Sequence, residues 1–239
     1  MVSPPRQLSL DVSLVDDATF NNFFTTPASA NHQVLDVLRS QLSTLDETSV
    51  FIWGNIGVGC SHLLQAACHA AHDASMTAVY LPLSELKDYS PADLLNGLEF
   101  QNLICIDDVQ LVFGAEDWER QLFHLYNRVK DQGGRLLFAA NEGPLSDAIQ
   151  LADLRSRLNW GLVFQVVVLS DEEKVAALIL RATKRGMDMS FDVGQFILSR
   201  YSRDLTRLFQ LLDRLDKASL VEQRRLTIPF VKDVLAQSL

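Results

Sequence analysis

The chain of 239 residues has only three cysteines, Cys60, Cys68 and Cys105. Their number and separation exclude a disulfide framework and a cysteine-based zinc site, and they favour reduced thiols. No apolar run approaches the roughly 18 residues that a membrane-spanning helix needs, and the N-terminus has no charged-then-apolar signal pattern. We therefore expect a folded cytoplasmic protein that does not contact a membrane.

Positive charge is scarce in the first two thirds of the chain. Residues 1–164 carry 9 Lys and Arg against 20 Asp and Glu, whereas residues 165–239 carry 12 against 10. Direct binding to nucleic acid depends on neutralising phosphates with basic side chains. The acidic body argues against such binding, so we expect any contact with DNA to be indirect, through another protein.

Five short apolar runs alternate with segments of helical period, which predicts an α/β fold: a parallel sheet with crossover helices on both faces. The runs are Val50 to Trp53, Thr77 to Leu81, Leu103 to Ile106, Leu136 to Ala140 and Val163 to Val168. After them only helices are predicted, and Ser170 and Glu173 form a capping box at the first. We therefore expect a mobile segment at 1–15, a nucleotide-binding base at 16–168 and a small helical lid at 169–239.

A phosphate-binding loop is present, but it lacks its lysine. The pattern G-x-x-x-x-G-K-[ST] is met at every fixed position except Cys60, between a predicted strand and a predicted helix. Backbone N–H groups and the helix N-terminus still favour phosphate. Loss of a charged hydrogen bond weakens binding by about ten- to a hundredfold, and turnover should suffer more. The predicted loop residues are Gly54, Asn55, Gly57, Val58, Gly59, Cys60, Ser61 and His62.

Polar residues follow two later strands. Asp107 and Asp108 end the third apolar run, and Asn141 follows the fourth. Asp107, together with Ser61, would hold Mg²⁺, and Asp108 would orient or activate the attacking water. Asn141 would orient a water against the terminal phosphate. Capping turns are the alternative interpretation for all three positions, but the phosphate loop earlier in the chain favours the functional one.

Three further patterns allow more than one interpretation. Cys60 at a helix start suggests a thiolate nucleophile, yet His62, two residues later on the helix, points away from it. Arg155 and Arg157 are either solvated or presented to a neighbouring nucleotide site. The N-terminal hexamer from Gln7 to Val12 alternates polar and apolar residues. It is either a frayed terminus or a peptide that binds in extended form.

Taken together, these residues resemble the Hda family of AAA+ proteins, which are related to the bacterial replication initiator DnaA. The resemblance covers nearly the whole chain. Besides the phosphate loop it rests on Thr19 to Phe23, Ile106 to Gln110, Leu154 to Gly161, Leu215 to Ser219 and Leu226 to Lys232. It implies an AAA+ P-loop NTPase-like fold with a helical lid.

The resemblance also implies partners and a function. Gln7, Leu8, Leu10 and Val12 match a hexamer that docks on the DNA polymerase sliding clamp, the β subunit. Arg157, rather than Arg155, matches an arginine finger that is offered in trans to ATP held by DnaA. Proteins of this family promote hydrolysis of that ATP and so prevent re-initiation of replication.

Two departures from the family concern the chain's own nucleotide. Cys60 stands where a cation is usual, and Thr206 stands where the lid has its sensor arginine, with Arg207 one step later. One step on a helix is about 100°, which turns Arg207 away from the usual position, but Arg207 stays among the predicted nucleotide-binding residues. We expect ADP or another nucleoside diphosphate, with or without Mg²⁺, or an empty site. An autonomous ATPase using Asp107 and Asp108, a nucleotide-free adaptor and a homo-oligomer remain open.

Overall fold

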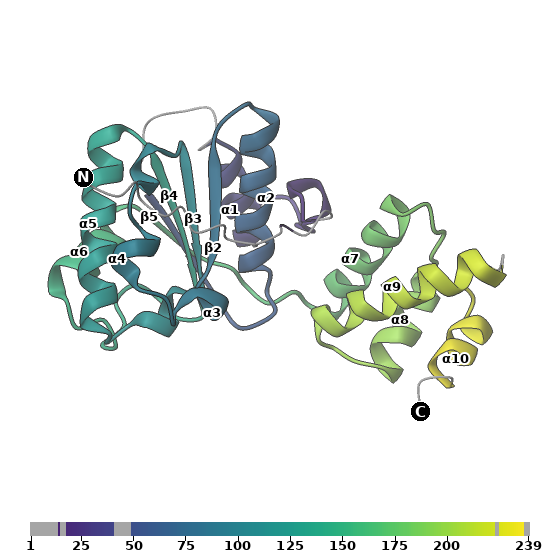
Figure 1. The fold of residues 1–239 in the computed structure, drawn as a ribbon. Coiled ribbons are helices and arrows are strands. Elements are labelled where there is room, and N and C mark those ends of the chain that lie inside the picture. Colours follow the sequence, from purple (N-terminus) through teal and green to yellow (C-terminus); the bar gives the residue numbers. More distant parts are fainter. Residues whose placement is uncertain (1–13, 15–17, 41–48, 223–224, 237–239) are drawn as a thin grey trace.

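The computed structural model describes residues 14, 18–40, 49–222 and 225–236. A sheet flanked by helices forms one unit, and a cluster of helices forms a second unit beside it (Figure 1). The N-terminal hexamer that matches a clamp-binding peptide lies outside the described residues.

The sheet has five parallel strands in the order β2-β3-β4-β1-β5, so the predicted parallel sheet is confirmed. Because β3, β4 and β1 are neighbours, Asp107, Asn141 and the phosphate loop after β1 meet at one edge of the sheet. The strands are β1 (Ser49–Trp53), β2 (Ala78–Pro82), β3 (Leu103–Asp107), β4 (Arg135–Ala140) and β5 (Leu162–Gln165).

Helices cover both faces of the sheet, as predicted. Alternate residues of a strand enter opposite cores: Val50 and Ile52 pack on one face, and Phe51 packs on the other. The first face carries α1 (Ala30–Ser40) and α2 (Cys60–Asp73), and the second carries α3 (Leu83–Leu86), α4 (Pro91–Leu94), α5 (Glu116–Gln132) and α6 (Ala152–Trp160). Short 3₁₀ turns are η1 (Phe20–Asn22), η2 (Leu98–Phe100) and η3 (Val109–Val112).

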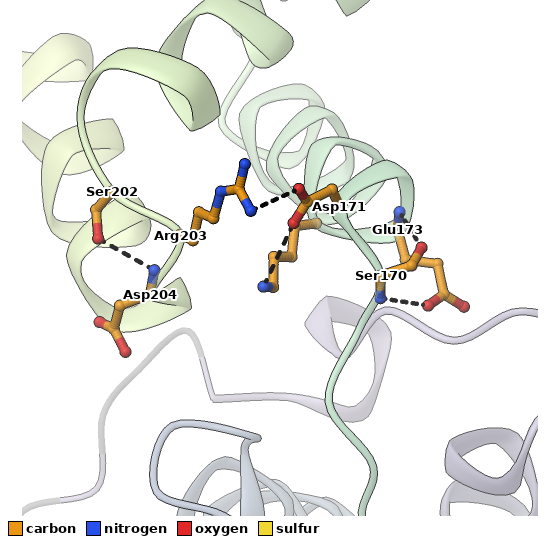
Figure 2. A network of polar contacts seen from close by, with 7 residues as sticks. Ser170, Asp171, Glu173, Ser202, Arg203 and Asp204 are labelled. Atoms are coloured by element: carbon orange, nitrogen blue, oxygen red, sulfur yellow. Dashed lines mark hydrogen bonds and ion pairs between the residues drawn. The ribbon is translucent and has the colours of Figure 1, made fainter.

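The second unit is all-helical and has its own core, which includes Leu178, Leu211 and Phe230. It consists of α7 (Asp171–Lys184), α8 (Phe191–Arg200), α9 (Leu205–Glu222) and α10 (Ile228–Ala236). The predicted capping box opens α7, since Ser170 accepts a bond from the Glu173 N–H and donates its own N–H to the Glu173 carboxylate (Figure 2). Within the described part of the chain, every helix is too short or too polar to cross a bilayer.

One predicted strand was too long. The apolar run from Val163 to Val168 pairs as β5 only as far as Gln165, although Val166 N–H still donates to Trp53 O over 2.7 Å. Next, Asn31, buried in α1, bonds both the N–H and the carbonyl of Val167. The Asn31 side chain thus takes the place of the backbone hydrogen bonds that a neighbouring strand would make with Val167. The strand therefore ends here, and the chain leaves the sheet toward the lid.

Candidate functional site

The phosphate loop connects β1 to α2, and two of its glycines are required by their surroundings. Gly59, just before α2, has φ of 106°, and a Cβ there would lie 2.8 Å from a ring carbon of Phe23. A Cβ on Gly54 would lie 2.4 Å from the carbonyl oxygen of Val166. Any larger residue would therefore clash or strain the loop. The first N–H groups of α2 have no helical partners, which makes this end of the helix a site for an anion.

A cavity of about 550 Å³ opens over the loop, and its volume is within the range of small-molecule and cofactor sites. The loop, the ends of β3 and β4, the segment before α1 and the lid helices α7 and α9 form its walls. Most of the predicted nucleotide-binding residues line it: Gly54, Asn55, Gly57, Val58, Gly59, Cys60, Ser61, His62, Asp107, Asp108 and Asn141. Arg207 does not.

Asp107 lies at the floor of the cavity and is only 3% exposed. The Tyr80 hydroxyl donates to one carboxylate oxygen over 2.6 Å, and the Asp108 N–H donates to the other over 2.9 Å. The Ser61 hydroxyl also bonds this carboxylate. Burial raises the pKa of Asp107, and the bonds from Tyr80 and Ser61 partly offset that rise.

Gln110 links the two other polar residues of this edge. Its side-chain N–H donates to an Asp108 carboxylate oxygen over 3.3 Å, and its side-chain oxygen accepts the Asn141 N–H over 3.2 Å. Asp108 itself is in the left-handed region with φ of 56°. Gln110 was part of the family resemblance, but its bridging role depends on η3 folding under β4 and is not visible in the sequence.

Cys60 contributes no charge to the loop. Burial, with the nearby Asp107 charge as the second cause, raises the pKa of its thiol to about 12. The thiol is therefore protonated at neutral pH, and a thiolate nucleophile is not available. His62 does not activate it, because its ring bonds the Thr19 carbonyl at 2.9 Å and lies against the Phe23 ring.

Ser61 and Asp107 are the residues that would hold Mg²⁺. Their hydroxyl and carboxylate oxygens are hydrogen-bonded to each other, and both are of the oxygen type that Mg²⁺ prefers. Mg²⁺ usually keeps several waters and takes few protein ligands beside the phosphates. The described residues include no cluster of three or more His, Cys, Asp or Glu side chains that could hold a metal ion by themselves.

The lid covers the loop through the start of α9. A Cβ built on Gly57 would lie 3.3 Å from an Asp204 carboxylate oxygen and 3.8 Å from the Thr206 hydroxyl. Asp204 also accepts the Arg207 N–H over 2.9 Å and so caps α9. Arg203, which precedes Asp204 and lies just before α9, forms an ion pair with Asp171 of α7 at 3.5 Å (Figure 2). This pair connects the start of α9 to α7. The lid thus brings a third carboxylate near the phosphate loop.

One positively charged side chain of the cavity wall was not predicted from the sequence. Arg181 of α7 lines the cavity, and its guanidinium carbon lies 4.3 Å from the ring centroid of Phe209 of α9. Thr206 lines the cavity too, whereas Arg207 is exposed outside it. Arg181 follows Ala177, another residue of the cavity wall, by one helical turn. Recognising it, however, requires knowing which face of α7 meets the loop.

Arg157 lies at the other end of the sheet. Its guanidinium carbon is 5.8 Å from the ring centroid of Tyr126 and 5.5 Å from that of Trp160. The Tyr126 hydroxyl bonds the Ser49 side chain, at the start of β1, whereas the phosphate loop follows the end of that strand. Trp160 is 67% exposed. Arg157 is therefore held at the surface, away from the chain's own cavity, while Arg155 reaches 4.0 Å from Asp147.

Comparison with known proteins matches both units of the chain. The family described as the bacterial DnaA ATPase domain matches residues 14–165, more than half of the chain. The chain belongs to this DnaA-related AAA+ family. The family described as the lid domain of Hda matches residues 171–235, so the lid is of the Hda type. These matches make the chain a DnaA-related replication protein with the AAA+ nucleotide-binding architecture.

One protein of similar sequence and two solved structures of similar fold match most of the chain. An uncharacterised protein of Haemophilus influenzae is 43% identical over 231 residues, covering 96% of this chain and 98% of that one. Domain III of the Thermotoga maritima replication initiation protein DnaA has a TM-score of 0.75 at 22% identity, covering 95% of this chain and 98% of that one. AMPPCP-bound DnaA from Aquifex aeolicus has a TM-score of 0.70 at 20% identity, covering 84% of this chain and 65% of that one. At these identities the two structures show the fold alone.

Proposed function

We propose that this protein, bound to the DNA-loaded sliding clamp, promotes hydrolysis of ATP on DnaA and so prevents re-initiation of replication. The observation that carries the proposal is the position of Arg157. Tyr126 and Trp160 hold its guanidinium at the end of the sheet opposite the phosphate loop. An arginine there cannot serve the chain's own cavity, but it can be presented to a nucleotide bound by a neighbouring subunit.

The chain's own site supports an accessory role for its nucleotide. Cys60 replaces the loop lysine, and the carboxylates of Asp107, Asp108 and Asp204 lie around the loop. The γ-phosphate of ATP would add negative charge near these three carboxylates, and the loop has no lysine to neutralise that charge. We infer that the cavity takes ADP or another nucleoside diphosphate, with Ser61 and Asp107 available for Mg²⁺. The AMPPCP carried by the Aquifex aeolicus DnaA supports a nucleotide as the occupant.

The N-terminal hexamer would deliver the finger to its target. The chain is acidic, with a net charge of −9, and therefore unsuited to direct DNA binding. The hexamer from Gln7 to Val12 alternates polar and apolar residues, as expected of a peptide that binds in extended form, and Gln7, Leu8, Leu10 and Val12 are the residues proposed to contact the clamp. Docking of this segment on the clamp would bring Arg157 to DnaA on newly replicated DNA.

A competing function is that of an autonomous ATPase. Asp107, Asp108 and Asn141 all reach the cavity, and Gln110 links the last two. These residues are the parts that hydrolysis requires besides a loop cation. The two functions differ in which protein must hold the ATP.

A hydrolysis assay separates them. Labelled ATP is bound to DnaA, excess nucleotide is removed, and the protein is added with and without clamp loaded on DNA. The proposal expects rapid hydrolysis only when protein, DnaA and loaded clamp are all present. Steady turnover by the protein alone, with no stimulation of DnaA, would support the autonomous ATPase instead.

A further inference from the structure

The nucleotide cavity is rich in carboxylates and poor in cations. Asp107 and Asp108 line it, and Asp204 approaches the loop from the lid. Cys60 is a neutral thiol where the loop would carry lysine. Of the described residues that line this cavity, Arg181 is the one Lys or Arg. Among the described lining side chains, the one Lys or Arg therefore belongs to the lid and not to the loop.

Arg181 packs against the neighbouring lid helix. Its guanidinium lies over the Phe209 ring at 4.3 Å from the centroid, and both side chains are half-buried in the cavity wall. Stacking uses the face of a guanidinium, whereas its N–H donors lie in the plane. A cation over a ring is attracted by the negative face of the ring, a contact that requires no N–H donor bonded to the ring. The contact also joins α7 to α9, the two lid helices that line the cavity.

Arg207 does not share this placement. It is exposed on α9, one residue after the cavity residue Thr206, and its own backbone N–H is bonded to Asp204. On the lid side of the cavity, the positive charge is therefore that of Arg181 on α7, and not one at the start of α9.

We propose that Arg181 binds the phosphates of the nucleotide and takes over the charge neutralisation that a loop lysine would provide. The inference rests on the proposal that the cavity holds a nucleotide. Because Arg181 belongs to the lid and the backbone amides belong to the base, one phosphate group would join the two units. Nucleotide binding would then fix the lid over the loop.

Calorimetric titration with ADP, AMP and adenosine tests this role in the full chain. Arg181→Gln should weaken ADP binding by roughly ten- to a hundredfold, the loss expected for a charged hydrogen bond. AMP should lose less, and adenosine should bind as it does to the wild type. Arg181→Lys should recover part of the ADP affinity. Arg200→Gln, an exposed change of the same charge at the end of α8, should leave all three affinities unchanged.

The outcomes distinguish this inference from the proposed function. Equal losses of affinity for ADP, AMP and adenosine would overturn this role, because Arg181 would then contact the adenosine part of the ligand or support the cavity wall. Unchanged ADP affinity, or an equal loss in Arg200→Gln, would overturn it as well. If the wild type bound none of the three, both this role and the nucleotide in the cavity would be wrong. The in-trans role of Arg157 is measured separately on DnaA. A thermal midpoint of Arg181→Gln matching the wild type, without nucleotide, shows that the variant is folded.

Discussion

The two ends of the central sheet differ in the positively charged side chains that they carry. At the end that carries the phosphate loop, a neutral Cys60 thiol faces the buried Asp107 carboxylate. At the other end, two aromatic rings hold the guanidinium of Arg157 at the surface. At the loop end the sheet unit supplies no Lys or Arg to the cavity, and the one described there is Arg181 of the lid, whereas at the other end the sheet unit itself carries a cation that only a partner could use. The difference indicates that binding a nucleotide and promoting hydrolysis are separate tasks in this molecule.

If Arg157 acts on ATP bound to DnaA, the N-terminal hexamer must bring the protein to DnaA by binding the DNA-loaded clamp. Replacing Gln7, Leu8 and Leu10 together by Ala should abolish clamp association and reduce stimulated hydrolysis to background, because these side chains are expected to fill pockets on the clamp. Pull-down with loaded clamp and the DnaA assay measure the two effects. Ser9→Ala, which changes the polar residue between the two leucines, should retain both. Clamp binding by the triple variant would disprove the delivery role.

The loop end can be tested by restoring its cation. Cys60→Lys should tighten binding of both ADP and ATP by about ten- to a hundredfold, because an ammonium group would again contact the phosphates. Calorimetric titration measures the change. Cys60→Ala adds no charge and should not tighten binding. Affinities that are the same in Cys60→Lys and the wild type would mean that the missing lysine does not limit binding.

The finger end can be weakened without removing the finger. Trp160→Ala removes one of the two rings beside Arg157 and should slow stimulated hydrolysis by about two- to fivefold, as expected for an exposed cation–π contact of about 0.5–1 kcal/mol. Trp160→Phe keeps a ring and should retain most of the rate. Because Trp160 is 67% exposed, the thermal midpoint should change little. A rate equal to the wild type in Trp160→Ala would show that this ring does not position the finger.

The buried carboxylate at the loop end predicts a small, pH-dependent effect on stability. Burial raises the pKa of Asp107 above its ordinary value of 3.8, so the folded state binds more protons than the unfolded state between these two values. The free energy of unfolding therefore falls as pH rises through that window and stays lower above it.

Asp107→Asn removes this cost. Without nucleotide it should raise the unfolding midpoint at neutral pH, because the amide has no charge to be buried. The gain should shrink as pH falls through the pKa of Asp107. Asp88→Asn, an exposed control, should change nothing at either pH. A gain that grows at low pH would contradict the assignment of a buried, destabilising charge.

Much of the architecture could be predicted from local pattern. The alternation of apolar runs and helical segments gave the parallel sheet and the lid, because each strand of the sheet interior is buried on both faces. The capping box at Ser170 was predicted from spacing alone. The end of β5 was not, because Asn31, distant in sequence, replaces the sheet's hydrogen bonds at Val167.

The site divides in the same way. The loop and the Asp107–Asp108 pair follow strands and could be located by spacing. Arg181 could not, because its place in the cavity depends on how α7 packs against α9 and over the loop. The stacking of Arg157 on Tyr126 likewise depends on α5 and α6 lying side by side. Contacts between distant elements carry these roles, and neither composition nor helical period reports them.

Single-turnover hydrolysis of labelled ATP held by DnaA, with loaded clamp present, tests the in-trans role of Arg157 most directly. Arg157→Ala should lower the stimulated rate toward background, since a finger contributes on the order of 10³ to 10⁵ in rate. Its folding, clamp binding and nucleotide affinity should stay close to those of the wild type. Arg155→Ala, two residues away, should retain most of the stimulation. Full stimulation by Arg157→Ala, or equal behaviour of the two variants, would contradict the account.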